Sequence, residues 1–308
     1  MENNMLHISA SPHIHSGRST ASIMRDVIIA LAPASIAGAV IFGLRALLII
    51  AVCVATCVVC EYFYNVIVKR YQSAGDLSAA VTGLLIALNV PANIPIWQCI
   101  VGSAFAIILV KCVFGGIGCN LVNPAITARI FMLVSFGSMA TQAMPKIVDV
   151  TAGATPLELI AGGETPAMKD LLLGTTGGAL GETCAVALIL GFIYLLARRI
   201  ITWHIPVVFV ASVFVLSYLS EGSLETALAL VLSGGLLIGA IFMATDYVTS
   251  PPTAWGKVLF GFGAGLLTFL IRKYGVYPEG VSFAILFMNI LTPYIERLTS
   301  HKIFGGVK

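Results

Sequence analysis

Long apolar stretches, separated by short polar ones, make up most of this chain. The hydrocarbon core of a bilayer is about 30 Å thick, so a helix that crosses it needs about 20 predominantly apolar residues. Ten stretches approach or reach that length. They cover residues 26–44, 46–68, 77–91, 96–113, 122–140, 180–197, 204–220, 223–244, 257–272 and 279–296. The pattern predicts an all-α integral membrane protein with about ten transmembrane helices.

The composition supports this fold class. Hydrophobic residues make up 58% of the 308 residues, charged residues only 10%, and the mean hydropathy is +0.99. Soluble globular proteins carry about 25% charged residues, so a soluble fold is excluded. Residues 1–24 are polar and contain no apolar region of the kind that a cleavable signal peptide has. The first apolar stretch is therefore expected to direct insertion into the cytoplasmic (inner) membrane of the cell.

Lysine and arginine favour one set of alternate loops. If the N-terminus is cytoplasmic, the cytoplasmic set holds 12 of the 17 basic residues, including Lys111 and Arg129, and the outer set holds 5. Arg129 could instead lie inside a span, which leaves the bias intact. Cytoplasmic loops carry the excess of positive charge, so both termini are predicted to be cytoplasmic. The net charge of +3 comes from these loops. No basic stripe with interleaved aromatic residues is present, so nucleic acid is not an expected partner.

Two short similarities suggest that the halves of the chain repeat one another, the alternative being chance similarity between apolar helices. Residues 83–86 and 235–238 are both Gly-Leu-Leu-Ile, and each is followed by a proline-bearing exit. Glycine, asparagine and proline interrupt both Gly115–Pro124 and Gly275–Pro293. Repeats with an odd number of spans insert in opposite orientations, so we expect two inverted five-helix repeats with irregular helices near the bilayer midplane.

These patterns give the expected organisation of the chain. The parts are a cytoplasmic segment at 1–24, a first five-helix half at 25–140, an external loop at 141–179, a second half at 180–297 and a cytoplasmic tail at 298–308.

The external loop carries the stretch Asp149–Thr155, with the sequence Asp-Val-Thr-Ala-Gly-Ala-Thr. Small residues leave its backbone open to a bulky partner. Pro156 keeps Thr155 out of a helix interior, because the residue before a proline is disfavoured in helical conformation. The Thr155 hydroxyl is therefore predicted to face water on the outer side. Gly-Ala-Thr-Pro alone is an ordinary loop sequence, so its meaning depends on the rest of the chain.

Several other segments occur in an order that matches one family. They are Ala10–His13 with Arg18, Asn123–Ala125, Gly181–Thr183, Phe242–Pro251 and Pro278–Ala284. The match covers about residues 6–296, far more than any single motif. The chain resembles the family that contains the D subunit of the Rnf electron-transport complex and the B subunit of the sodium-pumping NADH:quinone reductase.

The resemblance implies a flavoprotein. Thr155 would carry FMN through a phosphoester bond, attached by a dedicated flavin transferase that uses FAD. Asp149, Thr151, Gly153 and Ala154 would belong to the attachment motif. The third position before the threonine is usually Ser or Thr in the family. Here it is alanine, and Thr151 stands one position earlier. A riboflavin held without a covalent bond, reported for relatives, is also expected, with no residues assigned to it.

The resemblance also implies the partners and the activity. Electrons would pass between ferredoxin-side and NAD-side partners, coupled to translocation of sodium ions or protons. The other membrane, flavin and iron–sulfur subunits of an Rnf complex would be the partners. The sequence has neither a Rossmann fingerprint nor a ferredoxin-type cysteine run. Nucleotide and ferredoxin chemistry are thus expected on those partners, without a complete active site in this chain.

Charged and polar residues beside the apolar stretches are candidates for an ion path. Asp246, Asn123, Glu182 and Glu279 stand out, because a carboxylate in hydrocarbon is costly unless it is paired or lines a cavity. Broken helices at Asn123 and Asp246 would expose oxygen atoms to an ion. The alternative is that these residues cap or support helix ends. For Asp246 the two interpretations are equal, and for Glu182 and Glu279 the helix-end role is favoured.

Seven cysteines raise the possibility of a metal site. Cys53, Cys57 and Cys60 fall on one helical face and are expected to pack as small hydrophobic residues. Cys112 and Cys119 flank a glycine-rich break, but two cysteines cannot complete a four-thiolate cluster. A cluster shared with a neighbouring protein of the complex stays open, and no metal site is expected within this chain.

Two other functions compete with electron transfer. Inverted five-helix repeats with broken spans also suit a channel or transporter for a small neutral solute. A scaffold that only docks other proteins is the third hypothesis. Covalent flavin on Thr155 would distinguish the electron-transfer subunit from both the channel and the scaffold.

Overall fold

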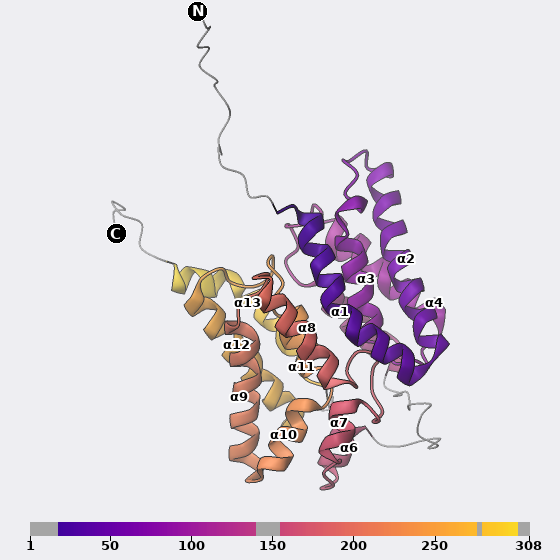
Figure 1. Ribbon diagram of the computed structural model, residues 1–308. Coiled ribbons are helices and arrows are strands. Elements are labelled where there is room, and N and C mark those ends of the chain that lie inside the picture. Colours follow the sequence, from indigo (N-terminus) through magenta and orange to yellow (C-terminus); the bar gives the residue numbers. More distant parts are fainter. Residues whose placement is uncertain (1–17, 140–154, 276–278, 301–308) are drawn as a thin grey trace, which may run out of the picture.

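The computed structural model describes residues 18–139, 155–275 and 279–300, and within these ranges the chain is helical without a β-strand (Figure 1). A helix occupies each of the ten stretches that the apolar pattern predicts. The chain is therefore an all-α membrane protein.

Five helices in the described ranges are long and apolar enough to cross a membrane by themselves. They are α1 (Thr20–Phe42), α2 (Leu44–Ile67), α9 (His204–Glu221), α12 (Ala254–Tyr274) and α13 (Val281–Thr299). A sixth span forms if α10 (Leu224–Leu232) is counted together with α11 (Leu236–Ile238) and the π-helix η4 (Gly239–Met243), which follow it after a bend of 63°.

Four predicted spans do not reach the length of those six, and three of the four are shorter than predicted. Three of them are α3 (Ser78–Leu88), α5 (Pro124–Ser135) and α8 (Ala185–Ala197), with 11, 12 and 13 residues. At 1.5 Å per residue such helices are only about 16–20 Å long, less than the hydrocarbon thickness. The fourth, α4 (Ile96–Phe105), continues directly as the π-helix η2 (Ala106–Cys112). The apolar pattern thus locates all four helices but overestimates how far α3, α5 and α8 extend, whereas α4 with η2 fills nearly the whole predicted stretch 96–113.

Helices pack both within each half of the sequence and, in the pair of α1 and α8, between the two halves. α1 packs against α8, α2 against α3, and α12 against both α9 and α13. Glycines allow the close approaches. A Cβ on Gly191 of α8 would overlap the Ala30 carbonyl oxygen of α1, and one on Gly83 of α3 would lie 2.7 Å from the Cα of Val54 in α2. The inverted repeat stays a prediction.

Short elements complete the described chain. They are the 3₁₀ turns η1 (Ala74–Asp76) and η3 (Gly137–Met139) and the helices α6 (Pro156–Ala161) and α7 (Met168–Leu173). α6 and α7 lie in the expected external loop and pack against α10, at the end of the molecule opposite the start of α1 (Figure 1). This places them on the side of the molecule that the predicted topology assigns to the outer face.

Candidate functional site

Thr155 is the N-cap of α6, and Pro156 is the first residue of that helix. The Thr155 Oγ1 accepts a hydrogen bond from the Glu158 backbone N–H at 3.2 Å, and the Thr155 backbone N–H donates to Glu158 Oε2 at 2.7 Å. This reciprocal capping box fixes the backbone at Thr155. The prediction that Pro156 keeps Thr155 out of a helix interior is confirmed.

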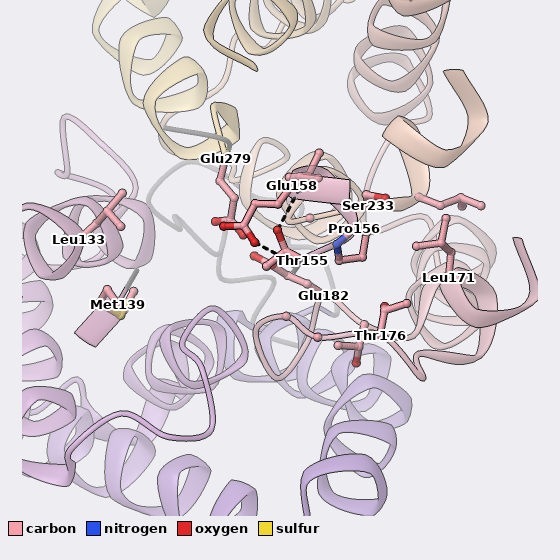
Figure 2. A pocket seen from close by; sticks show the side chains of 16 residues that line it. Leu133, Met139, Thr155, Pro156, Glu158, Leu171, Thr176, Glu182, Ser233 and Glu279 are labelled. Atoms are coloured by element: carbon pink, nitrogen blue, oxygen red, sulfur yellow. Dashed lines mark hydrogen bonds between the residues drawn. The ribbon is translucent and has the colours of Figure 1, made fainter. Parts of the chain in front are cut away.

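The predicted exposure of Thr155 to water is wrong, because only 7% of the residue is exposed. Thr155 lies in the wall of a cavity of about 270 Å³ (Figure 2). The neighbouring Leu157 is buried, and its Cδ1 would lie 2.8 Å from a Cβ on Gly234, in the break between α10 and α11. Packing of Leu157 against this break draws α6 onto the helical bundle, which explains why Thr155 is covered.

The other expected residues of the attachment motif lie outside the described part of the chain. They are Asp149, Thr151, Gly153 and Ala154. Their roles stay predictions.

Two predicted ion-path residues line the same cavity as Thr155. Glu182 precedes α8 and Glu279 precedes α13, and both border the cavity (Figure 2). They share the buried guanidinium of Arg129 in α5: its Nη2 donates to Glu182 Oε1 at 2.5 Å and also to Glu279 Oε2. Its Nη1 donates to Asn89 Oδ1 at 2.6 Å. Glu182 and Glu279 thus belong to an ion-paired cluster at the cavity.

Arg129 was not singled out from the sequence as a functional residue. It was counted with the cytoplasmic loops, with a position inside a span as the alternative, and the alternative is correct. It is 5% exposed and lies within α5. A charged residue in an apolar stretch is itself a signal for a functional or paired site. Its partners are 53 and 150 positions away in the sequence, so the pattern could not identify them.

The break between α10 and α11 makes room for this cluster. A Cβ on Gly235 would lie 2.7 Å from Glu182 Oε1 and 2.8 Å from Arg129 Nη1. The preceding Gly234 has a φ of +65°, a conformation that L side chains rarely adopt. Gly234 therefore allows the sharp bend, and Gly235 allows Glu182 and Arg129 to approach the backbone closely.

The other two ion-path candidates lie at a second cavity of about 330 Å³. Asn123 caps α5, since its Oδ1 accepts from the Ala125 N–H at 3.0 Å, and its Nδ2 donates to the Met243 carbonyl oxygen at 3.2 Å. Asp246 accepts from the Thr249 hydroxyl at 3.2 Å. Both residues therefore stabilise local turns and also border the cavity.

A polar connection runs between the residues of the two cavities. The amide of Asn89, which accepts from Arg129, has its Nδ2 at 2.7 Å from the Leu85 carbonyl oxygen and 3.8 Å from Met243 Sδ. The Met243 carbonyl oxygen in turn accepts from Asn123. Met243 belongs to the π-helix η4, a form that is frequent at functional sites.

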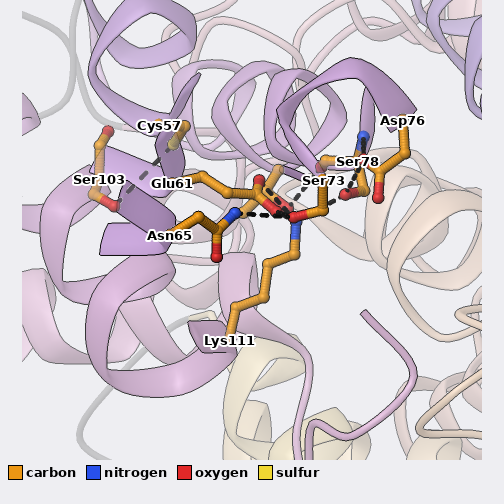
Figure 3. Close-up of polar contacts among 9 residues, drawn as sticks. Cys57, Glu61, Asn65, Ser73, Asp76, Ser78, Ser103 and Lys111 are labelled. Atoms are coloured by element: carbon orange, nitrogen blue, oxygen red, sulfur yellow. Dashed lines mark hydrogen bonds and ion pairs between the residues drawn. The ribbon is translucent and has the colours of Figure 1, made fainter. Parts of the chain in front are cut away.

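A second buried ion pair, between Lys111 and Glu61, was also missed from the sequence (Figure 3). The Lys111 Nζ lies 3.0 and 2.9 Å from the two Glu61 carboxylate oxygens and 2.6 Å from the Ser78 Oγ. The Ser73 hydroxyl donates to Glu61 Oε1 at 2.6 Å. Lys111 lies in the π-helix η2 and is 2% exposed, so its assignment to a loop is wrong.

Without Lys111 and Arg129, the predicted cytoplasmic loops hold ten basic residues against five in the outer loops. The positive-inside argument for the orientation is therefore preserved.

The cysteines mostly pack as hydrophobic residues. Cys53 and Cys57 are fully buried, as expected, and Cys60 is half-buried. Cys112 is buried and Cys119 is exposed. Within the described ranges, no three or more His, Cys, Asp or Glu side chains form a group that could hold a metal ion. A cluster shared with a neighbouring protein of the complex stays a hypothesis.

The sequence profile of the NQR2, RnfD, RnfE family matches residues 7–305. The chain is 45% identical to the D subunit of the Na⁺-translocating ferredoxin:NAD⁺ oxidoreductase complex of Acetobacterium woodii, over 98% of this chain and 96% of the relative. It is 38% identical to the D subunit of the proton-translocating complex of Clostridium ljungdahlii, over 99% and 98%. The D subunit of an ion-translocating oxidoreductase complex of Aliivibrio salmonicida is 33% identical, over 98% and 99%. The chain therefore belongs to the NQR2, RnfD, RnfE family.

Proposed function

We propose that this chain is a membrane subunit of an ion-translocating ferredoxin:NAD⁺ oxidoreductase complex and carries FMN on Thr155. The family membership supports the complex, because the relatives are named as subunits of such complexes. The observation that supports the flavin site is the Thr155 hydroxyl in the wall of a cavity beside an ion-paired cluster. A solute channel or a scaffold would not need a flavin attached to Thr155.

The residues around Thr155 suit attachment of a phosphoester. The hydrogen bond from the Glu158 N–H holds the Thr155 oxygen as an acceptor and leaves its proton available for removal. A flavin transferase would join this oxygen to the FMN phosphorus of FAD. The pyrophosphate bond breaks, AMP leaves with the bonding electrons, and the hydroxyl proton is released. The ester oxygen keeps the ability to accept from Glu158.

The residues that line the Thr155 cavity also have a chemistry that suits a flavin. FMN supplies one- and two-electron transfer, while the protein positions it and sets the charge around it. Leu133, Leu157 and Leu171 give the cavity an apolar side. Glu182 and Glu279 give it a charged side, and Arg129 compensates part of that charge. The chain would position the flavin and control its electrostatic surroundings.

The remaining steps belong to partners. Ferredoxin and NAD would react on other subunits, and electrons would reach and leave this chain through them. The coupled ion would be sodium or a proton. We place the Thr155 side of the molecule on the outer face of the cell membrane. A second, non-covalent riboflavin remains part of the proposal without assigned residues.

In-gel flavin fluorescence of the denatured chain, produced in cells that contain the flavin transferase, tests this proposal. Wild type should give a fluorescent band. Thr155→Val keeps the shape but lacks the hydroxyl, so its band should be dark while the chain still inserts and folds. Thr155→Ser restores a hydroxyl and serves as the matched control, with partial fluorescence expected. A fluorescent Thr155→Val band would contradict the assignment of the site.

A further inference from the structure

Two polar atoms in the wall of the Thr155 cavity have no hydrogen-bond partner among the described residues. They are Glu182 Oε2 and Thr183 Oγ1, on consecutive residues before α8. Glu182 is 4% and Thr183 5% exposed. A buried carboxylate oxygen or hydroxyl without a partner is costly. Figure 2 shows the Glu182 side chain directed toward Thr155 in the cavity. The pair of oxygens therefore indicates a ligand.

The charges around these oxygens leave a negative excess. Three carboxylates line the cavity, those of Glu158, Glu182 and Glu279. Two guanidiniums lie beside it: Arg129 is paired with Glu182 and Glu279, and Arg272 Nη2 lies 3.3 Å from a Cβ built on the cavity residue Gly234. A neutral donor group would satisfy the free oxygens but would leave this excess uncompensated. A cation satisfies both requirements, whether it is a metal ion or a proton that Glu182 shares with the adjacent Glu279.

Arg272 does not provide that cation. Its Nη1 donates to the Leu230 carbonyl oxygen at 2.6 Å and its Nη2 to the Ser233 carbonyl oxygen at 3.1 Å. These bonds hold the guanidinium at the C-terminal end of α10. It compensates charge from a distance without occupying the free side of the Glu182 carboxylate.

We propose that Glu182 Oε2 and Thr183 Oγ1 form a binding site for a small monovalent cation, with Glu279 completing its negative surroundings. Carboxylate and hydroxyl oxygens are the ligands that hard cations prefer. The two oxygens of the Glu182 carboxylate differ: Oε1 accepts from Arg129, and Oε2 is buried without a hydrogen-bond partner among the described residues. Arg129 thereby positions the carboxylate without occupying the cation site.

This site deepens the proposed function, because the class of cation rests on the ion translocation proposed above. A cation bound beside Thr155 would lie next to the flavin whose charge changes on reduction. The site would thus bring the ion and the redox group into one cavity.

Binding of ²²Na⁺ to the purified full-length chain in lipid nanodiscs tests the site, with K⁺ as the competing salt. Wild type should bind saturably. Thr183→Val removes one ligand without touching the ion pairs and should weaken binding at least about tenfold, and Glu182→Gln should abolish it. Glu225→Gln makes the same change at an exposed position of α10 and should bind like wild type.

A second arm distinguishes a proton from sodium. The pH is lowered from 8 to 6 in sodium-free buffer, and proton uptake is followed with an indicator dye. Uptake that is present in wild type and missing in Glu182→Gln, without ²²Na⁺ binding, would identify the proton as the ligand. Neither ion bound by wild type, or equal binding by wild type, Thr183→Val and Glu182→Gln, would overturn the site.

The flavin itself is the competing occupant. Thr155→Val should bind the cation as well as wild type does, because the free oxygens belong to residues 182 and 183. If only Thr155→Val binds, the flavin fills this part of the cavity and the cation site is wrong. Since flavin attachment is read from fluorescence and the cation from direct binding, the failure of one proposal is separable from the failure of the other.

Discussion

At the scale of single residues, the burial of an ion pair decides how much stability its removal costs. Arg129 is buried between two carboxylates and an amide, whereas the side chain of Arg198, whose Nη2 lies 3.2 Å from Asp26 Oδ2, is 53% exposed. Removing one partner from a buried pair leaves an uncompensated charge and costs about 3–5 kcal/mol, whereas exposed pairs contribute about 0–1 kcal/mol.

Arg129→Leu should therefore destabilise the chain by about 3–5 kcal/mol, and Arg198→Leu by less than about 1 kcal/mol. The measurement is the temperature at which the fully buried Cys53 and Cys57 react with a fluorogenic thiol reagent in detergent, after the exposed Cys119 has been blocked in the folded chain. Arg129→Lys should lie between wild type and Arg129→Leu, because an ammonium lacks the planar fork that reaches three partners. Equal shifts for the two leucine variants would contradict the role assigned to the cluster.

The Glu61–Lys111 pair is a second case, because the buried Lys111 ammonium lies within 3.0 Å of three oxygen atoms, two of Glu61 and one of Ser78. Lys111→Met alone should destabilise by about 3–5 kcal/mol, since it strands the Glu61 carboxylate. The double variant with Glu61→Gln should recover much of that loss, and a thermodynamic cycle over the two singles and the double measures the coupling. Additive effects would show that the pair is not coupled.

At the scale of elements, the breaks in helices decide which side chains meet at the Thr155 cavity. The Gly234–Gly235 break between α10 and α11 bends a span by 63° and brings Leu157, Glu182 and Arg129 together. The apolar pattern predicted one continuous span over 223–244, so the break at the two glycines was missed, whereas Asn and Pro mark the end of α3 and the start of α5. Helix positions could therefore be predicted from local pattern, but the helix that each break would meet could not.

Gly235→Ala tests the break, because its Cβ would meet Glu182 and Arg129 at under 3 Å. Overpacking of this kind costs about 1–3 kcal/mol, and cation binding should fall in parallel. Gly75→Ala is the matched control, since a Cβ there has no neighbour within 4 Å. The temperature at which the buried cysteines react compares the two variants. A Gly235→Ala chain as stable as Gly75→Ala would contradict the claim that the glycine break makes room for the ion pairs.

At the scale of the whole molecule, the apolar pattern and the basic residues predict the fold class and an orientation. They do not predict how the halves interlock, with α1 of the first against α8 of the second, because that contact joins residues far apart in sequence. The burial of Thr155 was missed for the same reason. Local sequence shows a loop with small residues, while the cover comes from Leu157 packing on α10 and α11.

The orientation can be tested with a membrane-impermeant thiol reagent. Cys119 is exposed and should react only in inside-out vesicles. Lys169→Cys places a thiol on exposed α7 and should react in intact cells whose outer membrane is permeabilised. The reverse pattern would show that the Thr155 side faces the cytoplasm.

The central claim is that Thr155 carries the flavin. Mass mapping of a peptide covering residues 147–169, from the chain purified out of cells with the flavin transferase, tests it most directly. We predict an FMN-sized addition, joined as a phosphoester, with fragment ions that assign it to Thr155. An unmodified peptide, or an addition assigned to Thr151 or Thr165, would contradict the account.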